Sequence, residues 1–306
     1  MASDASGLRN RWVQLALGIL AMIMIANLQY GWTLFVQPLQ DAHGWKKAAI
    51  QQAFTLFVLL EVWLVPLNGW IVDRIGPRPS TAVAGVLVAL GWGLCARADS
   101  LMLLYLGASL AGVGAGMVYG TMVGAAAKSF PDHRGLAVGA TAAGFGAGAA
   151  LTVIPISATI AHAGYAAAFA TFGLAQGLVL ILIALVLRAP DLVASPATPS
   201  AAAAVRQIDA DFSPFQMLRT PQFYLLYAMF TMIATGLLFM TAQVAPLAKD
   251  FGLGKTQLHV AGLAFATLPF VLIVDNVLNG GSRVFFGWIS DRVGRELTMT
   301  FAFALE

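Results

Sequence analysis

The sequence predicts an all-α protein that crosses a lipid bilayer several times. Hydrophobic residues make up 59% of the 306 residues, and charged residues only 10%. Soluble domains carry roughly 25% charged residues, so this chain has too little charge to cover a surface exposed to water. A mean hydropathy of +0.80 supports the same interpretation. A bilayer tolerates an apolar exterior, and helices that satisfy their own backbone hydrogen bonds are the simplest way to cross it.

Eight apolar runs reach the length of about 20 residues that a membrane-spanning helix needs. They cover residues 12–37, 48–72, 80–97, 101–127, 135–163, 165–188, 221–247 and 258–288, and a ninth begins near Leu297. The apolar run that follows the polar residues 1–10 has no small-residue cleavage site. We therefore expect it to be a retained first helix, not a signal peptide.

One long polar stretch divides these runs into two sets. Residues 189–219 are rich in Ala, Pro, Ser and Asp, which is typical of a linker. This stretch would join an N-terminal bundle of six helices, residues 1–188, to an incomplete C-terminal bundle, residues 220–306, with helices seven, eight and the start of nine. Whether the chain is a fragment of a longer protein stays open at this point.

The distribution of Lys and Arg predicts the orientation of the helices. If the N-terminus and the linker share one side of the membrane, that side carries 11 Lys and Arg residues and the other side carries 5. Loops with an excess of Lys and Arg face the cytoplasm. We therefore expect the N-terminus and the linker to be cytoplasmic.

A loop motif occurs twice, 218 residues apart. The first copy contains Gly69, Asp73, Arg74, Gly76 and Arg78, and the second contains Gly287, Asp291, Arg292, Gly294 and Arg295. We expect the first glycine of each copy to let two helices approach closely, and the second glycine to form a tight turn. The aspartates can accept hydrogen bonds from a neighbouring helix end or from an arginine, so the motif predicts a gating loop. The alternative is a solvated turn that happens to be charged.

Glu61, Asp275 and Arg283 are the main functional candidates inside the apolar runs, because a charge within the bilayer is costly and is usually functional. Arg283 can bind a carboxylate in bidentate fashion, although it could instead reach the headgroups at the nearby helix end. Asp275 and Glu61 are candidates for proton coupling. Asp275 could equally be a structural hydrogen-bond acceptor or lie near the outer interface, and Glu61 could pair with a neighbouring helix.

Two further sets of residues suit a transport pathway. Amide and phenol groups that could line a central anion site are Gln29, Tyr30, Gln51 and Tyr119. Glycines at four-residue intervals in the fourth run are Gly112, Gly116, Gly120 and Gly124. Such a stripe permits close, sliding helix contacts.

The repeated loop resembles the signature loop of the major facilitator superfamily, and the rest of the chain is similar to the oxalate:formate antiporter branch of that family. The matching stretches begin at Asn10, Gln29, Gln51, Gly116, Phe130, Met217 and Asn279. The resemblance implies a bacterial inner-membrane carrier that exchanges small carboxylates by alternating access. It also implies that Arg283 binds the carboxylate while Gln29, Tyr30, Gln51 and Tyr119 line the site.

The resemblance has two departures. The second cationic residue of the family, a lysine in helix eleven, would lie beyond Glu306. Glu61 and Asp275 stand where the oxalate exchanger has uncharged polar residues, and two buried acids would weaken binding of a dianion unless they were protonated. A proton-coupled monocarboxylate transporter is therefore an alternative function. A non-transporting membrane sensor built on the same fold is a second alternative.

Other functional classes find little support in the sequence. One cysteine and four scattered histidines give no metal-ligand spacing, and we expect no metal and no cofactor. No nucleophile–base pair or phosphate loop is present, so we do not expect an enzyme. A drug exporter would carry a Gly-Pro pair in the fifth helix, which is absent here. The expected partners are a small organic anion and the lipid bilayer, with no nucleic acid, and we expect a monomer.

Overall fold

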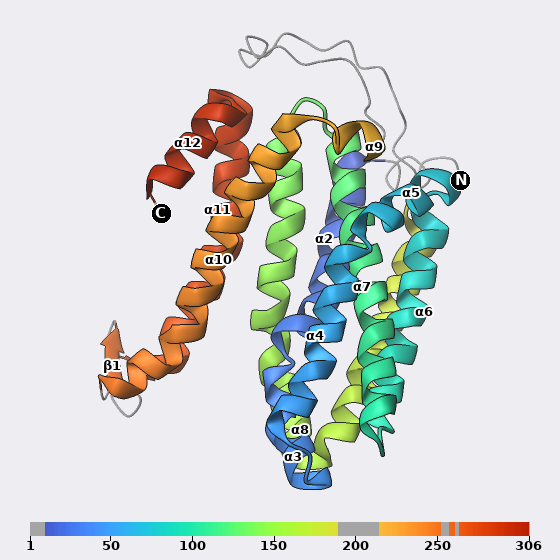
Figure 1. The fold of residues 1–306 in the computed structure, drawn as a ribbon, viewed down its shortest axis with the longest axis vertical. Coiled ribbons are helices and arrows are strands. Elements are labelled where there is room, and N and C mark those ends of the chain that lie inside the picture. The colour runs from blue at the N-terminus through green and yellow to red at the C-terminus, as the bar shows by residue number, and fades with distance from the viewer. Residues whose placement is uncertain (1–9, 189–213, 252–256, 261–262, 306) are drawn as a thin grey trace. The chain divides into compact units, whose positions relative to one another are not determined.

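The computed structural model describes residues 10–188, 214–251, 257–260 and 263–305, with the backbone alone at 214, 237–250, 257–260, 263–273, 275 and 276. Helices dominate these residues, which confirms the all-α prediction (Figure 1). The helices are α2 (Arg11–Tyr30), α3 (Thr33–His43), α4 (Lys47–Trp63), α5 (Val65–Ile75), α6 (Pro77–Ala96), α7 (Leu101–Ser129), α8 (Arg134–Val186), α9 (Pro214–Met217), α10 (Pro221–Asp250), α11 (Thr267–Val293) and α12 (Arg295–Leu305). Most of the predicted linker, residues 189–213, lies outside the described residues.

The predicted helix at 258–288 is wrong at its start. Two short antiparallel strands, β1 (Gln257–Val260) and β2 (Leu263–Ala266), occupy this segment, and α11 begins only at Thr267. A short apolar run cannot be assigned to helix or strand from its periodicity alone. Two such runs separated by two residues that include a glycine are, in hindsight, a hairpin signal.

Two of the other predicted helices are broken in the middle. The first run divides into α2 and α3 at Gly31 and Trp32. The second divides into α4 and α5, which are bent by 51°. Pro66 follows this break directly, and its ring cannot continue the hydrogen-bond pattern of the preceding turn.

The fifth and sixth predicted helices meet at a single residue. They form the 53-residue helix α8, which Gly164 interrupts with a φ of 83°. This conformation is open to glycine and disfavoured for other residues. The predicted boundary between residues 163 and 165 is therefore confirmed, and each arm of α8 is long enough to cross a bilayer.

By length and composition, four helices of the described residues can each span a membrane: α2, α6, α7 and α8. The bent pair α4 and α5 adds a fifth if it forms one span. Large apolar side chains on these helices face outward; examples are Met102, Ile154 and Leu185. Such an exterior is expected in lipid, where an apolar surface carries no penalty.

The chain forms two compact units, one of residues Met1–Thr198 with Asn279–Asp291 and the other of Pro199–Leu278 with Arg292–Glu306. In the first unit α6 packs against α7 and α8, α2 packs against α8, and α4 packs against α7. The rings of Phe35 and Phe169 stack at 3.8 Å between centroids, and Trp92 lies edge-on to both. The second unit comprises α9, α10, the β1–β2 pair, the first part of α11 and α12.

Two of the four glycines in the predicted stripe of α7 lie in close contact with a neighbouring helix. A Cβ atom added at Gly112 would strike the backbone of Phe57, and one added at Gly116 would strike the backbone of Glu61. These two glycines let α7 approach α4 directly. A Cβ atom at Gly120 or Gly124 would meet nothing within 4 Å among the described residues.

This difference gives a matched pair of substitutions on one helix. We expect Gly116→Val to destabilise the protein by about 1–3 kcal/mol, the usual cost of an overpacked contact. Gly120→Val adds the same side chain into open space and should be close to neutral. Thermal unfolding of the detergent-solubilised protein measures both, and equal melting temperatures for the two variants would contradict the close α4–α7 contact.

Candidate functional site

Arg283 lies in α11 within the first compact unit, with its side chain half-buried. Its Nε donates to Oδ1 of Asn279 at 3.2 Å, and its Nη1 donates to the carbonyl oxygen of Ala142 in α8 at 3.4 Å. The backbone of Arg283 lies so close to Gly139 that a Cβ atom there would clash with the Arg283 carbonyl. Helices α8 and α11 are therefore in direct contact where the guanidinium is held.

Three aromatic residues come together near this arginine. Phe145, which is buried in α8, meets Tyr30 at 5.4 Å and Tyr119 at 5.8 Å between ring centroids, and both contacts are edge-on. The Tyr30 hydroxyl is within electrostatic range of Arg283, Glu61 and Tyr119. The structure thus brings three predicted site residues, Arg283, Tyr30 and Tyr119, into one neighbourhood.

The two predicted glutamines lie on α2 and α4. Oε1 of Gln51 accepts a hydrogen bond from Nε1 of Trp32 at 3.2 Å, which ties the start of α3 to α4. Gln29 is half-buried beside Tyr30 in the sequence. The Gln51 amide is thus partly occupied by a structural contact, which sequence reasoning did not anticipate.

The structure describes the side chain of only one of the two candidate acids, Glu61. Glu61 is 7% exposed in α4, and no hydrogen-bond partner of its carboxyl group is present among the described residues. Its electrostatic contact with Tyr30 places it near the arginine neighbourhood. The side chain of Asp275 lies outside the described residues.

The site contains residues that sequence reasoning missed. Asn279 precedes Arg283 by four residues, and this spacing on a helix was the signal that could have revealed the pair. Phe145 and the Ala142 carbonyl become relevant only through packing of α8. A buried amide pair, Gln176 with Asn27 at 2.6 Å, also joins α8 to α2.

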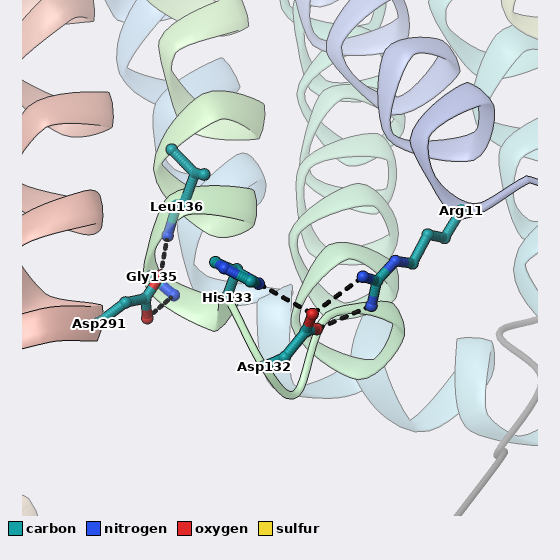
Figure 2. A network of polar contacts seen from close by, with 6 residues as sticks. All are labelled: Arg11, Asp132, His133, Gly135, Leu136 and Asp291. Carbon is teal, nitrogen blue, oxygen red and sulfur yellow. Dashed lines mark hydrogen bonds and ion pairs between the residues drawn. The ribbon is translucent and has the colours of Figure 1, made fainter. Parts of the chain in front are cut away.

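The second copy of the loop motif contacts the start of α8. Asp291 accepts hydrogen bonds from the backbone N–H groups of Gly135 at 2.6 Å and Leu136 at 2.7 Å (Figure 2). These groups belong to the first helical turn, which has no intrahelical acceptor, and a negative charge there is favoured by the helix dipole. The expected acceptance of hydrogen bonds from a neighbouring helix end is confirmed for Asp291. The close helix approach predicted for Gly287 is also confirmed, because a Cβ atom there would strike Gly135.

The first copy of the motif behaves differently. Asp73 forms an ion pair with Lys128, in the last turn of α7, at 2.8 Å; this is neither an arginine nor a helix N–H group. The Asp73 side chain is 65% exposed, so the pair is solvated and weak. The close approach predicted for Gly69 is wrong among the described residues, where a Cβ atom would meet nothing within 4 Å.

The basic residues and turn glycines of the motif have distinct surroundings. Arg74 lies over the ring of Trp70 at 4.2 Å, and Nε of Arg78 donates to the carbonyl of Leu187 at the end of α8. Gly76 and Gly294 have φ angles of 86° and 100°, which confirms the tight turns. Arg292 and Arg295 are exposed. The gating role of these residues stays a prediction.

A polar network at the loop that precedes α8 was not predicted from the sequence. The two terminal nitrogens of Arg11, Nη1 and Nη2, donate to the Asp132 carboxylate at 2.8 and 2.9 Å (Figure 2). Nδ1 of His133 contacts the same carboxylate at 2.8 Å. Partial burial acts to raise the pKa of Asp132, but the hydrogen bonds from Arg11 and His133 outweigh it and lower the pKa to about 2. The network ties the start of α2 to the loop that leads into α8.

Metal chemistry has no visible site in the described part of the chain, where no three His, Cys, Asp or Glu residues gather to hold an ion. What the geometry offers instead is a half-buried cation in contact with α8 and beside a phenol group of α2, two helices that can each span a membrane. This combination suits recognition of an organic anion within a bilayer.

Comparison with known proteins agrees with that geometry. The family model of the Major Facilitator Superfamily matches residues 17–305. The chain is 38% identical to the oxalate:formate antiporter of Oxalobacter formigenes over 298 residues, which is 97% of this chain and 68% of that protein. It is 31% identical to human monocarboxylate transporter 11 over 234 residues, 74% of this chain and 45% of that protein. It is 26% identical to the uncharacterized MFS-type transporter YhjX of Escherichia coli, over 95% of this chain and 69% of that protein.

The chain therefore belongs to the major facilitator superfamily. It is a multi-pass membrane transporter and not an enzyme. It spans about two thirds of the length of the Oxalobacter relative.

The capping contact of Asp291 can be tested directly. Asparagine keeps one acceptor oxygen but places an amide N–H group opposite a backbone N–H group, so Asp291→Asn should weaken the cap by about 1–2 kcal/mol. We expect amide hydrogen exchange at Gly135 and Leu136 to accelerate roughly fivefold to thirtyfold. Asp73→Asn, the same change in the other copy, should leave this exchange unaltered. Equal exchange in all three proteins would contradict the cap.

The lowered pKa of Asp132 predicts acid resistance of the α2–α8 link. A carboxylate whose pKa falls on folding contributes stability above its ordinary pKa, and that contribution is lost as the pH drops through about 2. Spin labels at Ala16→Cys and Pro131→Cys should keep a narrow distance distribution from pH 7 to pH 4. Asp132→Asn should broaden this distribution already at pH 7, and a distribution insensitive to the substitution would rule out the link.

Proposed function

We propose that the protein carries small carboxylate anions across a bacterial inner membrane by alternating access, in exchange of the oxalate-for-formate type. The observation that carries this proposal is the half-buried guanidinium of Arg283, held by Asn279 and Ala142 beside the Tyr30 hydroxyl. A planar guanidinium matches a carboxylate in bidentate geometry, and low dielectric strengthens the pair. The similarity to a relative named oxalate:formate antiporter supports the same substrate class.

In this proposal, binding and gating are assigned to different residues. Arg283 anchors the anion, while Tyr30 and Tyr119 line the site with phenol groups and Gln29 and Gln51 offer amide groups. The loop motifs act at the end of the bundle where Asp291 meets α8, and release of that contact accompanies opening. We infer that this end is cytoplasmic, with the N-terminus and the linker on the same side, from the excess of Lys and Arg there. The carrier would act as a monomer.

A second candidate is a proton-coupled monocarboxylate transporter. The observation that favours it is the buried Glu61, which lies within electrostatic range of Tyr30 close to the anion site. An acid there can take up a proton with each anion, and Asp275 offers a second acid in α11. The 31% identity with human monocarboxylate transporter 11 is in keeping with this alternative.

Uptake assays separate the two candidates. The product of the complete gene, reconstituted in proteoliposomes, would be given labelled oxalate, formate or acetate with and without internal oxalate and with and without a pH gradient. An exchanger takes up label only against an internal anion. A proton-coupled carrier takes up label when the pH gradient is the sole driving force. Failure to take up any carboxylate under either condition would contradict both candidates.

Arg283 provides the sharpest test of the anion site. Arg283→Gln retains hydrogen-bonding capacity but removes the charge, so we expect uptake to fall at least a hundredfold with normal expression. Arg283→Lys keeps the charge but loses the planar fork, and it should retain a small residual activity with a raised KM. Uptake by Arg283→Gln equal to that of the parent protein would exclude Arg283 as the anchor.

A further inference from the structure

The position of the Arg283 guanidinium is fixed by two contacts that come from different helices. One is the side chain of Asn279, one turn earlier on α11, and the other is the backbone carbonyl of Ala142 on α8. Gly139 brings the two backbones together at the same level, since any side chain there would collide with the Arg283 carbonyl. The arginine is thus held at its backbone and at two of its nitrogen atoms.

These contacts determine which donors remain. A guanidinium has five N–H groups and no acceptor. The single N–H of Nε is taken by Asn279, and one N–H of Nη1 is taken by Ala142. The three remaining N–H groups all belong to the terminal nitrogens Nη1 and Nη2, and the Tyr30 hydroxyl lies within hydrogen-bonding reach of the guanidinium. Because the Nε edge is occupied by Asn279, a carboxylate would approach the terminal fork, beside Tyr30.

The orientation of the Asn279 side-chain amide also follows from the donors of the arginine. An arginine cannot accept a hydrogen bond, so the asparagine must present its oxygen to Nε and turn its NH₂ group away. The hydrogen bond to Asn279, 3.2 Å, is at the long end of the usual range, and the one to Ala142, 3.4 Å, is longer than usual. They orient the guanidinium without neutralising its charge, which a carboxylate in place of Asn279 would do.

We propose that Asn279 is the positioning residue of the anion site: by occupying Nε it directs the terminal fork of Arg283 toward the transported carboxylate. This inference rests on the proposed function and assigns to Asn279 a role through Arg283, without contact with the substrate. A purely structural asparagine would affect stability alone. A positioning asparagine must affect affinity and the discrimination between anions.

The test compares four forms of the complete gene product in proteoliposomes. Asn279→Leu removes the acceptor but keeps the number and branching of the side-chain heavy atoms, Asn279→Asp keeps the acceptor but adds a negative charge, and Ser282→Ala is the control. Ser282 is exposed one residue from Arg283, and its hydroxyl donates to the Asn279 backbone carbonyl, not to its side chain. Oxalate and formate exchange would be measured as KM and maximal rate for each form.

We expect Asn279→Leu to raise the KM for oxalate about tenfold, the usual effect of losing a hydrogen bond to a charged group. Its maximal rate should change less than about threefold, because the gating contacts are elsewhere. The ratio of the oxalate KM to the formate KM should shift, since a dianion depends more on an oriented fork. Asn279→Asp should retain the orientation but lose oxalate affinity through charge neutralisation, and Ser282→Ala should match the parent protein.

An oxalate KM and an oxalate-to-formate ratio unchanged in Asn279→Leu would overturn the inference. If Asn279→Leu fails to fold, Asn279→Ser and Asn279→Ala decide the question by the same two readouts. A parent protein that transports no carboxylate contradicts the proposed function. A parent protein that transports carboxylates while every Asn279 variant keeps its KM contradicts the positioning role alone.

Discussion

The close crossing of α8 and α11 is the contact on which the functional part of the structure depends. Gly135 meets Gly287, and Gly139 meets Arg283, so the two backbones touch at two levels of the same interface. Helix association within lipid lacks a hydrophobic driving force and relies on such small-residue packing and on polar contacts. Arg283 with the Ala142 carbonyl and Asp291 with the start of α8 supply the polar contacts. The proposed anion site and the capped helix end are therefore parts of one interface.

The rest of the first compact unit supports that interface through α8. Its first arm packs on α2 through Gly144 and Gly148, which lie against the backbone of Ile19 and Ile23. Its second arm packs on α6, where Gly173 makes room for Trp92. Phe145, next to Gly144 in the same arm, contacts the rings of Tyr30 and Tyr119. One helix thus connects the apolar core, the phenol groups and the arginine.

Most of the helical fold could be predicted from the sequence because bilayer length and apolarity restrict the choices strongly. The boundary at Gly164 was visible as a one-residue gap between two apolar runs. Strands β1 and β2 were missed because the periodicity of short apolar runs does not separate strand from helix, and the spacing of the two runs was the signal that could have revealed them. Within the site, Arg283 was identifiable from its cost in lipid. Its partners Ala142 and Phe145 were not, since they depend on how α8 packs and carry no chemical signal of their own. The difference between Gly116 and Gly120 likewise arises only from where α4 ends its contact with α7.

The spacing of Arg283 and Asp291 has a mechanical consequence. The two residues are eight positions apart on α11, and their contacts on α8, Ala142 and Gly135, are seven positions apart. This corresponds to about 12 Å along α11 and about 10.5 Å along α8, or roughly two helical turns on each. The two polar contacts therefore join the same two helices, α8 and α11, at two levels. A slide of α11 along α8 would strain both contacts at once, because each of them joins these two helices.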